Sequence, residues 1–359
     1  MSTTLLIFLV LVLVIVIVVQ LARAGELLSI ARGAKEGEVS AETNRALAYF
    51  MIAFLILGMI GGFWSVAYYK PLFLPAASSV HGVAIDELFN ITLLFTGIVF
   101  IITQILVFWF AFRYRGGSGR KAYYFPHSNK LELIWTVVPS VVMTVLVIMG
   151  LRTWFHTLTP SQKPELEVEA IAEQFNWTIR YAGKDGKLGK RHFEKISAEN
   201  PLGIDWSDEN SHDDFITAEI HLPVDKLVLF RLSAKDVLHS FFLPHFRVKM
   251  DCVPGIPTQF PFTPTETTEK KRNELNDPNF MFFLACAELC GVSHWNMRRN
   301  LFVETEEEFQ KWADEQKPAY DAGAVKVSLE NKKDNTQDNS EKKDEQTGEI
   351  PVSAAHKTP

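Results

Sequence analysis

Several features that decide the class of a protein are absent from this sequence of 359 residues. It contains no C-x-x-C-H motif, which excludes a c-type haem attached to this chain. It shows no basic footprint typical of nucleic-acid binding, and its formal net charge is −6. Charged residues are also missing from long apolar runs in the first half, where much of the 47% hydrophobic content is concentrated. These absences indicate a membrane protein without a nucleic-acid partner.

Four apolar runs, residues 5–21, 47–68, 91–112 and 133–151, have the length of about 20 residues that crosses a bilayer. Basic residues are concentrated in the connecting stretches 23–45 and 113–130, which we therefore expect in the cytoplasm. Alternation of sides then places both termini, and everything after about residue 153, outside the cytoplasm.

The first apolar run has an alternative interpretation as a cleaved signal peptide, because Ala22-Arg23-Ala24 resembles an A-x-A cleavage site. Its leading residues, Met-Ser-Thr-Thr, carry no positive charge, and cleavage would leave the basic stretch 23–45 outside. We therefore expect all four spans to be retained.

A short segment near the end of the chain gathers ligands for a soft metal. Cys286, Cys290, His294 and Met297 lie within twelve residues, and His239 offers a second imidazole upstream. Thiolate and thioether ligands beside imidazole select copper or zinc, and the methionine favours copper, because zinc in proteins rarely takes a thioether. A disulfide between the two cysteines, or a zinc site, remains an alternative for this segment.

At this point the chain resembles subunit II of the haem-copper cytochrome c oxidases, which reduce oxygen to water. The resemblance is carried by Asp236-Val-Leu-His239-Ser, by the stretch 248–255 with its V-K-x-D-x-x-P-G pattern, by the C-x-E-x-C-G-x-x-H-x-x-M loop at 286–297, and by the stretch 129–139. It implies that Cys286 and Cys290 bridge two coppers, the dinuclear centre called CuA. His239 and Met297 would complete one copper, and His294 with the carbonyl of Glu288 the other.

The resemblance implies further roles for single residues. The side chain of Glu288 would hold a magnesium ion shared with subunit I. Glu132 would lie at the entrance of a proton channel into subunit I, although a glutamate near a helix N-terminus is also favoured by the helix dipole alone. Phe175 stands where the family has the tryptophan that accepts electrons, and Trp177 is retained. Because phenylalanine is harder to oxidise than tryptophan, the donor or its docking geometry could differ.

The expected fold is four transmembrane helices followed by an all-β, cupredoxin-like Greek-key barrel. Alternating segments at 166–171, 177–181, 216–222, 227–232 and 280–284 predict strands, and 304–316 predicts an amphipathic helix. The predicted domains are an extra helix with a cytoplasmic loop (1–46), a second extra helix with an outer loop (47–90), a helical hairpin (91–152), the CuA domain (153–316) and a disordered tail (317–359). The segment 187–214 looks inserted and ends in the acidic, polar stretch 205–214; it is either a solvated loop or an acidic docking patch for a basic cytochrome.

The function implied is that of subunit II of a haem-copper oxidase, with the CuA domain on the periplasmic side of a bacterial inner membrane. Electrons from a separate cytochrome c domain or respiratory complex would pass through the copper centre to the haem of subunit I, coupled to proton pumping. Oxygen would be reduced in subunit I and not in this chain. The partners would be subunit I, other oxidase subunits and membrane lipid. The alternative is the CuA-bearing subunit of a nitric or nitrous oxide reductase.

Overall fold

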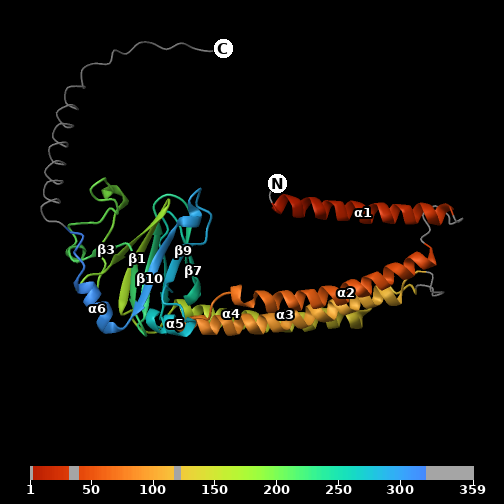
Figure 1. Cartoon of the computed structure of the whole chain (residues 1–359). Helices are drawn as coiled ribbons and strands as arrows, with labels where there is room; N and C mark the ends of the chain where they lie inside the picture. Colours follow the sequence, from red (N-terminus) through yellow and green to blue (C-terminus); the bar gives the residue numbers. More distant parts are fainter. Residues whose placement is uncertain (1–2, 32–39, 117–122, 321–359) are drawn as a thin grey trace, which may run out of the picture. The chain divides into compact units, whose positions relative to one another are not determined.

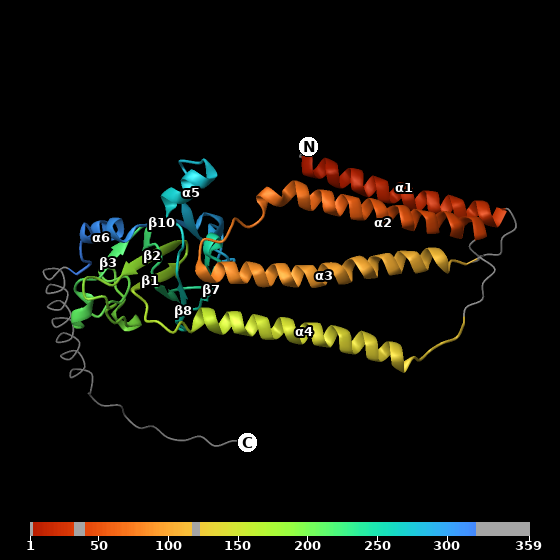
Figure 2. The same ribbon diagram turned by 90° about the horizontal axis from the view of Figure 1, so that it is seen from below.

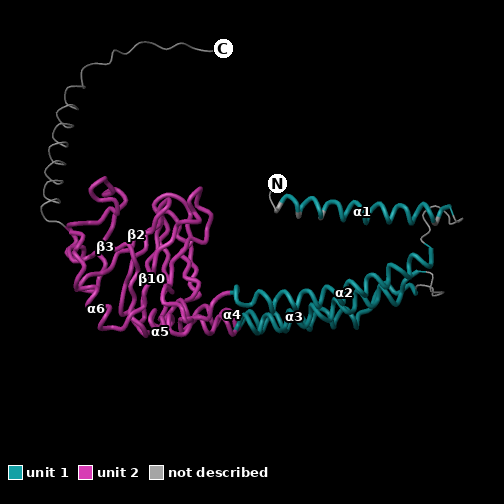
Figure 3. The backbone as a smooth tube through the Cα atoms, in the orientation of Figure 1, with its two compact units in different colours: residues 1–73, 88–148 teal, residues 74–87, 149–359 magenta. Residues whose placement is uncertain are grey.

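The computed structural model describes residues 3–31, 40–116 and 123–320. It divides into two units, coloured in Figure 3: residues 1–73 with 88–148, and residues 74–87 with 149–359. The first unit is helical and the second is built around a β-sandwich. The tail predicted to be disordered lies almost entirely outside the described residues.

Four long helices, labelled in Figures 1 and 2, confirm the four predicted spans: α1 (Thr3–Ala31), α2 (Ala41–Tyr69), α3 (Val80–Arg113) and α4 (Asn129–Leu158). Each is long and apolar enough to cross a membrane. They extend beyond the apolar runs, so Arg23, which we expected in a loop, lies within α1, and α3 begins eleven residues before the predicted span. The reason is that hydropathy marks only the apolar part, whereas helical hydrogen bonding continues into polar flanks. At α2 the hydroxyl of Ser40 supplies the N-cap by accepting the backbone N–H of Thr43 at 3.1 Å.

Aromatic pairs join α2 to α3 within the helical unit. The rings of Tyr49 and Phe112 are 5.3 Å apart, and those of Phe54 and Phe108 are 5.9 Å apart. Such pairs contribute about 0.5–1.5 kcal/mol each beyond their buried area. Helix α2 is therefore attached to one helix of the hairpin that we predicted over residues 91–152.

Two five-stranded sheets form the sandwich of the second unit, with strand orders β3-β2-β1-β5-β8 and β4-β10-β9-β6-β7. The strands are β1 (Leu166–Glu173), β2 (Asn176–Tyr181), β3 (Phe215–Thr217), β4 (Ile220–Pro223), β5 (Val228–Ala234), β6 (His239–Leu243), β7 (Val248–Cys252), β8 (Thr258–Phe262), β9 (Phe282–Cys286) and β10 (Arg298–Glu304). Two short helices accompany them, α5 (Thr268–Leu275) and α6 (Glu306–Asp314). The predicted all-β domain and the amphipathic helix near its end are thus both present.

One predicted strand is wrong. We expected a single strand over 216–222, but the chain changes sheets there: Ile216 of β3 pairs with Arg180 of β2, whereas Ile220 of β4 pairs with Leu301 of β10. A local turn, in which the Thr217 hydroxyl donates to the Glu219 carbonyl at 2.7 Å, separates the two pieces. Alternation of side chains continues through such a crossing, so the sequence pattern does not reveal it. The pattern also missed β6, β7, β8, β10 and α5.

The core lies between the sheets and takes side chains from both of them. The largest fully buried apolar side chains include Trp177, Tyr181, Phe230, Phe241 and Phe282. Burial of each such side chain stabilises the fold by about 1.5–3 kcal/mol. The buried Tyr181 hydroxyl is satisfied as well, because it donates to the carbonyl of His221 and accepts its backbone N–H.

Four connections meet at one end of this sandwich. Strands β1 and β5 run parallel with Ala172 opposite Ala234, so the β1–β2 and β5–β6 connections lie at the same end. His239, the first residue of β6, pairs with Cys252, the last residue of β7, so the β7–β8 connection also lies at this end. The backbone N–H of Ala287, directly after β9, donates to the carbonyl of Ser240, so the β9–β10 connection lies there too. These are the segments in which the metal ligands were predicted.

The segment Leu74–Glu87 packs at the other end of the sandwich. The Ser79 hydroxyl donates to the carbonyl of Phe246 at 2.6 Å, just beyond the far end of β6. The Arg247 guanidinium donates to both carboxylate oxygens of Asp86, at 2.7 and 2.9 Å, and also to backbone carbonyls. Within this unit, the segment is therefore attached at the end opposite the four connections.

Candidate metal centre

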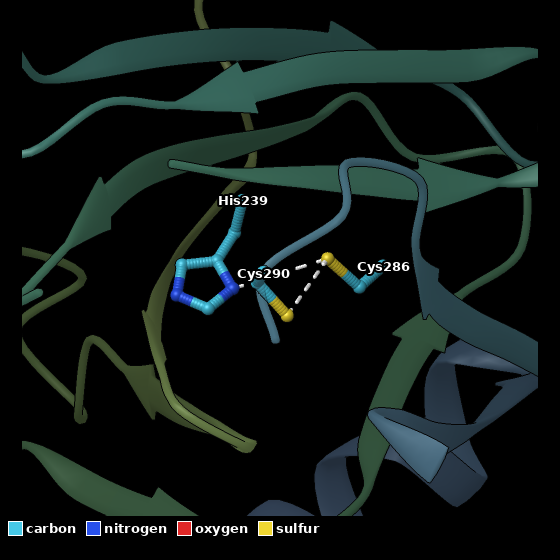
Figure 4. Close-up of side chains that lie close together, drawn as sticks. All are labelled: His239, Cys286 and Cys290. Atoms are coloured by element: carbon cyan, nitrogen blue, oxygen red, sulfur yellow. Dashed lines mark hydrogen bonds between the residues drawn. The ribbon is translucent and has the colours of Figure 1, made fainter. Parts of the chain in front are cut away.

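Strand ends hold the first two candidate ligands in place. His239 is the first residue of β6 and Cys286 the last of β9, and both side chains are buried. The Cys286 sulfur lies 3.9 Å from His239 Nδ1 and 4.0 Å from the Cys290 sulfur, and Figure 4 shows the three side chains converging. Their ligand atoms all lie within 4.8 Å of one another, as expected for groups that share a metal.

The β9–β10 connection supplies the remaining candidates. The Cys290 sulfur lies 3.6 Å from His294 Nδ1 and 3.8 Å from the Met297 sulfur. The carbonyl oxygen of Glu288 is 3.2 Å from the Cys286 sulfur. The structure thus gathers every first-coordination atom that the sequence suggested, two thiols, two imidazole nitrogens, a thioether and a carbonyl, into one continuous cluster.

The thiol chemistry of the cluster fits a metal better than a disulfide. Cys286 and Cys290 are both free, and their separation of 4.0 Å is about twice a sulfur–sulfur bond. Burial, together with the neighbouring Cys286, raises the pKa of the Cys290 thiol to about 11. That thiol therefore carries a proton at neutral pH, which a metal would displace on binding.

Hydrogen bonds from outside the cluster orient its ligands. The Asp236 carboxylate lies 2.9 Å from His239 Nε2, which leaves Nδ1 directed at the sulfurs, and its other oxygen accepts the Gln174 backbone N–H at 2.6 Å. Burial raises the pKa of Asp236, but the hydrogen bonds with His239 and Gln174 outweigh this and hold that pKa below its usual value. Asp236 is therefore an anionic partner that fixes one imidazole.

The β1–β2 turn braces the ligand connection, which the sequence alone did not reveal. Gln174 donates from Nε2 to the carbonyl of Cys290 at 2.5 Å. A Cβ on Gly291 would lie 2.9 Å from the Phe175 ring, and Gly291 has a φ of +140°, so only glycine fits there. The signals that could have identified these residues are the position of Gln174 beside the expected electron-accepting aromatic and the glycine directly after Cys290.

The two aromatic residues expected at the electron-accepting surface differ in burial. Trp177 is 1% exposed, and its ring contacts that of His239 edge-on with centroids 6.2 Å apart. Its Nε1 donates to the Met297 carbonyl at 3.4 Å. Phe175 is half-buried against Gly291. Trp177 is therefore part of the floor of the site, and Phe175 lies nearer the surface.

Glu132, singled out from the sequence, lies outside the cluster, as do the nearby thiol and imidazole of Cys252 and His245. Glu132, in the first turn of α4, is exposed and accepts the Ser128 backbone N–H at 3.4 Å. Cys252 is fully buried, and burial raises its pKa to about 12, so it is a structural cysteine. His245 is also buried, packed edge-on among three phenylalanine rings, so it is a packing residue.

Three of the seven acidic residues of the segment 187–214 are engaged within the segment or the core. Asp214 is fully buried and lies 3.0 Å from the Arg180 guanidinium. Asp205 pairs with Lys195, and Asp208 accepts the Lys190 backbone N–H at 3.1 Å. The exposed Glu194, Glu199 and Glu209 form no ion pair within the described residues, so both interpretations of the segment, a solvated loop or a docking patch, stay predictions.

With this geometry in place, the chain can be compared with known proteins. The profile "Cytochrome C oxidase subunit II, periplasmic domain" matches residues 166–303, and "Cytochrome C oxidase subunit II, transmembrane domain" matches residues 67–153. Helix α1 and most of α2 precede both matches. The class is therefore a cupredoxin-like domain joined to membrane-spanning helices.

Named relatives identify the family. The alternative cytochrome c oxidase subunit 2 of Bradyrhizobium diazoefficiens is 37% identical over 235 residues, covering 65% of this chain and 80% of the relative. Cytochrome c oxidase subunit 2 of Thermostichus vulcanus is 28% identical over 264 residues, covering 67% and 77%. Among solved structures, the periplasmic domain of subunit II of cytochrome oxidase of Bradyrhizobium japonicum is 28% identical, covers 43% of this chain and 94% of its own, and has a TM-score of 0.29.

The chain belongs to the cytochrome c oxidase subunit II family. It is therefore a multi-pass membrane subunit of a haem-copper oxidase complex, with an extramembrane domain.

Proposed function

We propose that this subunit holds a dinuclear copper centre, accepts electrons on it from a separate cytochrome c donor, and delivers them to the haem of subunit I. A bound copper pair would supply a carrier that takes up and releases one electron with little change of geometry. The residues that would hold it are Cys286 and Cys290 as bridges, with His239, His294, Met297 and the carbonyl of Glu288 as terminal ligands.

The observation that carries this proposal is the donor set itself. Two buried thiols lie 4.0 Å apart, and each has its own imidazole nitrogen, within 3.9 Å for Cys286 and 3.6 Å for Cys290. A single tetrahedral zinc needs only four ligands and rarely takes a thioether, so it would leave two of these six atoms without a role. Asp236 and Gln174 orient these groups through hydrogen bonds to the His239 ring and to the carbonyl of Cys290.

The test is paramagnetic resonance on the purified full-length subunit or oxidase after copper loading. We expect a signal in which one unpaired electron is shared between two copper nuclei, with two coppers per chain by metal analysis. A spectrum of one isolated copper, or zinc retained in preference to copper, would overturn the proposal.

The remaining roles are part of the same proposal. The side chain of Glu288 is half-buried and forms no hydrogen bond or ion pair within the described part of the chain, which is compatible with a magnesium ion shared with subunit I. The extramembrane domain would lie on the periplasmic side of a bacterial inner membrane, since the basic stretches 23–45 and 113–130 favour the cytoplasm.

Proton uptake would begin at Glu132. Its carboxylate is exposed at the N-terminal end of α4, the end that charge patterning places in the cytoplasm. Glu132→Ala should slow turnover of the assembled oxidase while copper content and reduction of the copper centre stay intact. Unchanged oxygen consumption would show that Glu132 only stabilises the N-terminus of α4 through the helix dipole.

A further inference from the structure

Two buried histidines outside the metal centre lie where the segment Leu74–Glu87 meets the sandwich. His81 is 8% exposed and His245 is 7% exposed. The carbonyl of His245, just beyond β6, accepts the backbone N–H of Ser78 at 2.7 Å. His81 follows in the first turn of α3, ten residues before the apolar run 91–112 that we predicted to span the membrane. Both imidazoles therefore belong to one junction, outside the predicted span.

Aromatic rings surround both imidazoles. The His81 ring lies 5.4 Å from that of Phe260 and 6.3 Å from that of Phe262, measured between centroids. Three further rings surround His245 at 5.2–5.5 Å, those of Phe280, Phe282 and Phe283. Among the described residues, both ring nitrogens of His81 and Nδ1 of His245 have no hydrogen-bond partner. The closed junction therefore suits neutral imidazoles and provides no acceptor for an added proton.

The charged groups around His245 oppose its protonation. They come from three places, Lys271 of α5, Arg247 after β6 and Arg298 of β10. Lys271 already pairs with Glu266 at 2.8 Å and with Glu274 at 3.1 Å, so these carboxylates are engaged. The stretch 280–286, which supplies the phenylalanine rings, contains no Asp, Glu, Lys or Arg. Burial, followed by the three cations, lowers the pKa of His245 to about 4.

His81 lies in similar surroundings. Strand β8, which supplies its two phenylalanine rings, has no charged residue. The side chain of Arg247 packs against Gly82, where an added Cβ would lie 3.2 Å from the arginine Cγ. Asp86, on the same helix as His81, is bound by the Arg247 guanidinium at 2.7 Å. A proton on His81 would thus have a cation beside it, and the nearby carboxylate is already paired.

From these observations we infer that the junction is an acid-sensitive latch, in which protonation of His81 and His245 releases the segment Leu74–Glu87 from the sandwich. A charged imidazole needs water, which it reaches only when the junction opens. Since the open junction takes up protons more readily than the closed one, the closed state loses stability as pH falls below about 6.5. Acidification on the side of the membrane that holds the sandwich would therefore loosen its attachment to the start of α3. The inference does not depend on bound copper.

The test is hydrogen–deuterium exchange on the assembled oxidase at about pH 8 and about pH 5, corrected for the intrinsic exchange rate. The amides of Ser78 and Val80 report opening, because they are bonded to the carbonyls of His245 and Thr263. With a pKa of about 6.5 in the open state and about 4 in the closed state, His245 alone predicts an about 30-fold rise in the open fraction at the lower pH. His81 should add a further rise of the same sign.

Histidine-to-phenylalanine variants separate the two contributions, because phenylalanine suits an aromatic environment and takes up no proton. His245→Phe should remove about 30-fold of the rise. The double variant with His81→Phe should open to nearly the same extent at both pH values. His192→Phe is the matched control, because the His192 side chain is 54% exposed and lies in the segment 187–214, outside the junction. It should show the full rise of the native chain.

Three results would overturn the inference. The first is exchange at Ser78 and Val80 that does not change between the two pH values in the native chain, a measurement that needs no variant to fold. The second is an undiminished rise in the double variant. The third is an equal rise at the amide of Phe230 in the middle of β5, which would show general unfolding of the sandwich in acid instead of release at the junction.

Discussion

The helical unit and the β-sandwich use the same apolar residues in opposite ways. Phe100 of α3 is 55% exposed, whereas Phe230 of β5 is fully buried. The most hydrophobic stretches of α1, α3 and α4 have no buried residues, while the sandwich closes a continuous core between two sheets. The difference shows that the helices leave their apolar surface for lipid or partner subunits, whereas the sandwich must exclude water by its own packing.

The two units also differ in how far along the chain the hydrogen-bond partners of their polar side chains lie. On the helices the hydroxyls of Thr92, Ser140 and Thr144 donate to carbonyls four residues earlier, so their partners are local. In the sandwich Arg180 reaches Asp214, 34 residues away, and the ligand braces Gln174 and Asp236 are 62 residues apart. The polar side chains of the helices therefore find their partners within the same helix, whereas the arrangement of the candidate metal centre depends on contacts across the whole domain.

The largest expected effect distinguishes a cysteine of the candidate metal centre, Cys290, from the third cysteine of the sandwich, Cys252. Cys290→Ser should abolish the two-copper signal, because it removes a sulfur that neighbours Cys286, His294 and Met297. Cys252→Ser should retain the signal and lower only stability, by about 1–3 kcal/mol, because it places a hydroxyl in a fully buried position. Metal analysis with paramagnetic resonance distinguishes the two variants. Loss of the signal in Cys252→Ser would show that the third thiol belongs to the site.

The same substitution made in each region tests the comparison directly. Phe230→Ala should destabilise the sandwich by about 3–5 kcal/mol, because it leaves a cavity in a closed core. Phe100→Ala should cost less than about 1 kcal/mol, since lipid or detergent can fill the space beside an exposed side chain. Thermal unfolding of the solubilised full-length subunit measures both. Equal losses of stability would mean that Phe100 is buried in a packed interface.

A third test compares two arginine–carboxylate pairs of the sandwich. Arg247→Ala should cost about 3 kcal/mol, because its side chain is 8% exposed and joins Asp86 to two backbone carbonyls. Arg231→Ala is the control and should cost less than about 1 kcal/mol, since its side chain is half exposed and, among the described residues, pairs with Glu167 alone. Thermal unfolding together with proteolysis near Leu74–Glu87 would detect release of that segment. Similar costs for both variants would contradict its proposed anchoring.

The smallest effect concerns pH. Burial, with Lys271, Arg247 and Arg298 nearby, lowers the pKa of His245 to about 4. Between the unfolded value of about 6.5 and that lowered value, only the unfolded chain takes up the proton, so stability falls as pH decreases. His245→Phe should remove this loss, gaining about 2 kcal/mol relative to the native chain at about pH 5 compared with pH 7. Parallel stability curves for the two proteins from pH 7 to pH 4.5 would contradict this prediction, because they would show that the pKa of His245 is the same in the folded and the unfolded chain.

How much of the site could be predicted depended on where its signals lie in the chain. The stretch 286–297 carries four candidate ligand side chains and one candidate carbonyl within twelve residues, so the spacing and residue types alone indicated copper. The brace from Gln174 to the carbonyl of Cys290 spans 116 residues, and no local pattern could reveal it. The crossing between β3 and β4 was missed for a different reason. The two strands continue one alternating pattern, so the sequence does not show that they belong to different sheets.

The sequence by itself determined what its local chemistry dictates: four helices whose apolar length spans a bilayer, and a soft-metal ligand set whose types and spacing leave few alternatives. Only the tertiary structure decided that Trp177 is a buried floor, that Asp236 and Gln174 orient the ligands, and that Trp295 and Val292 stand exposed beside them. The physical reason is that burial and hydrogen bonding between distant strands depend on which sheet and which end each segment joins, and this is fixed only when the two sheets close on a common core.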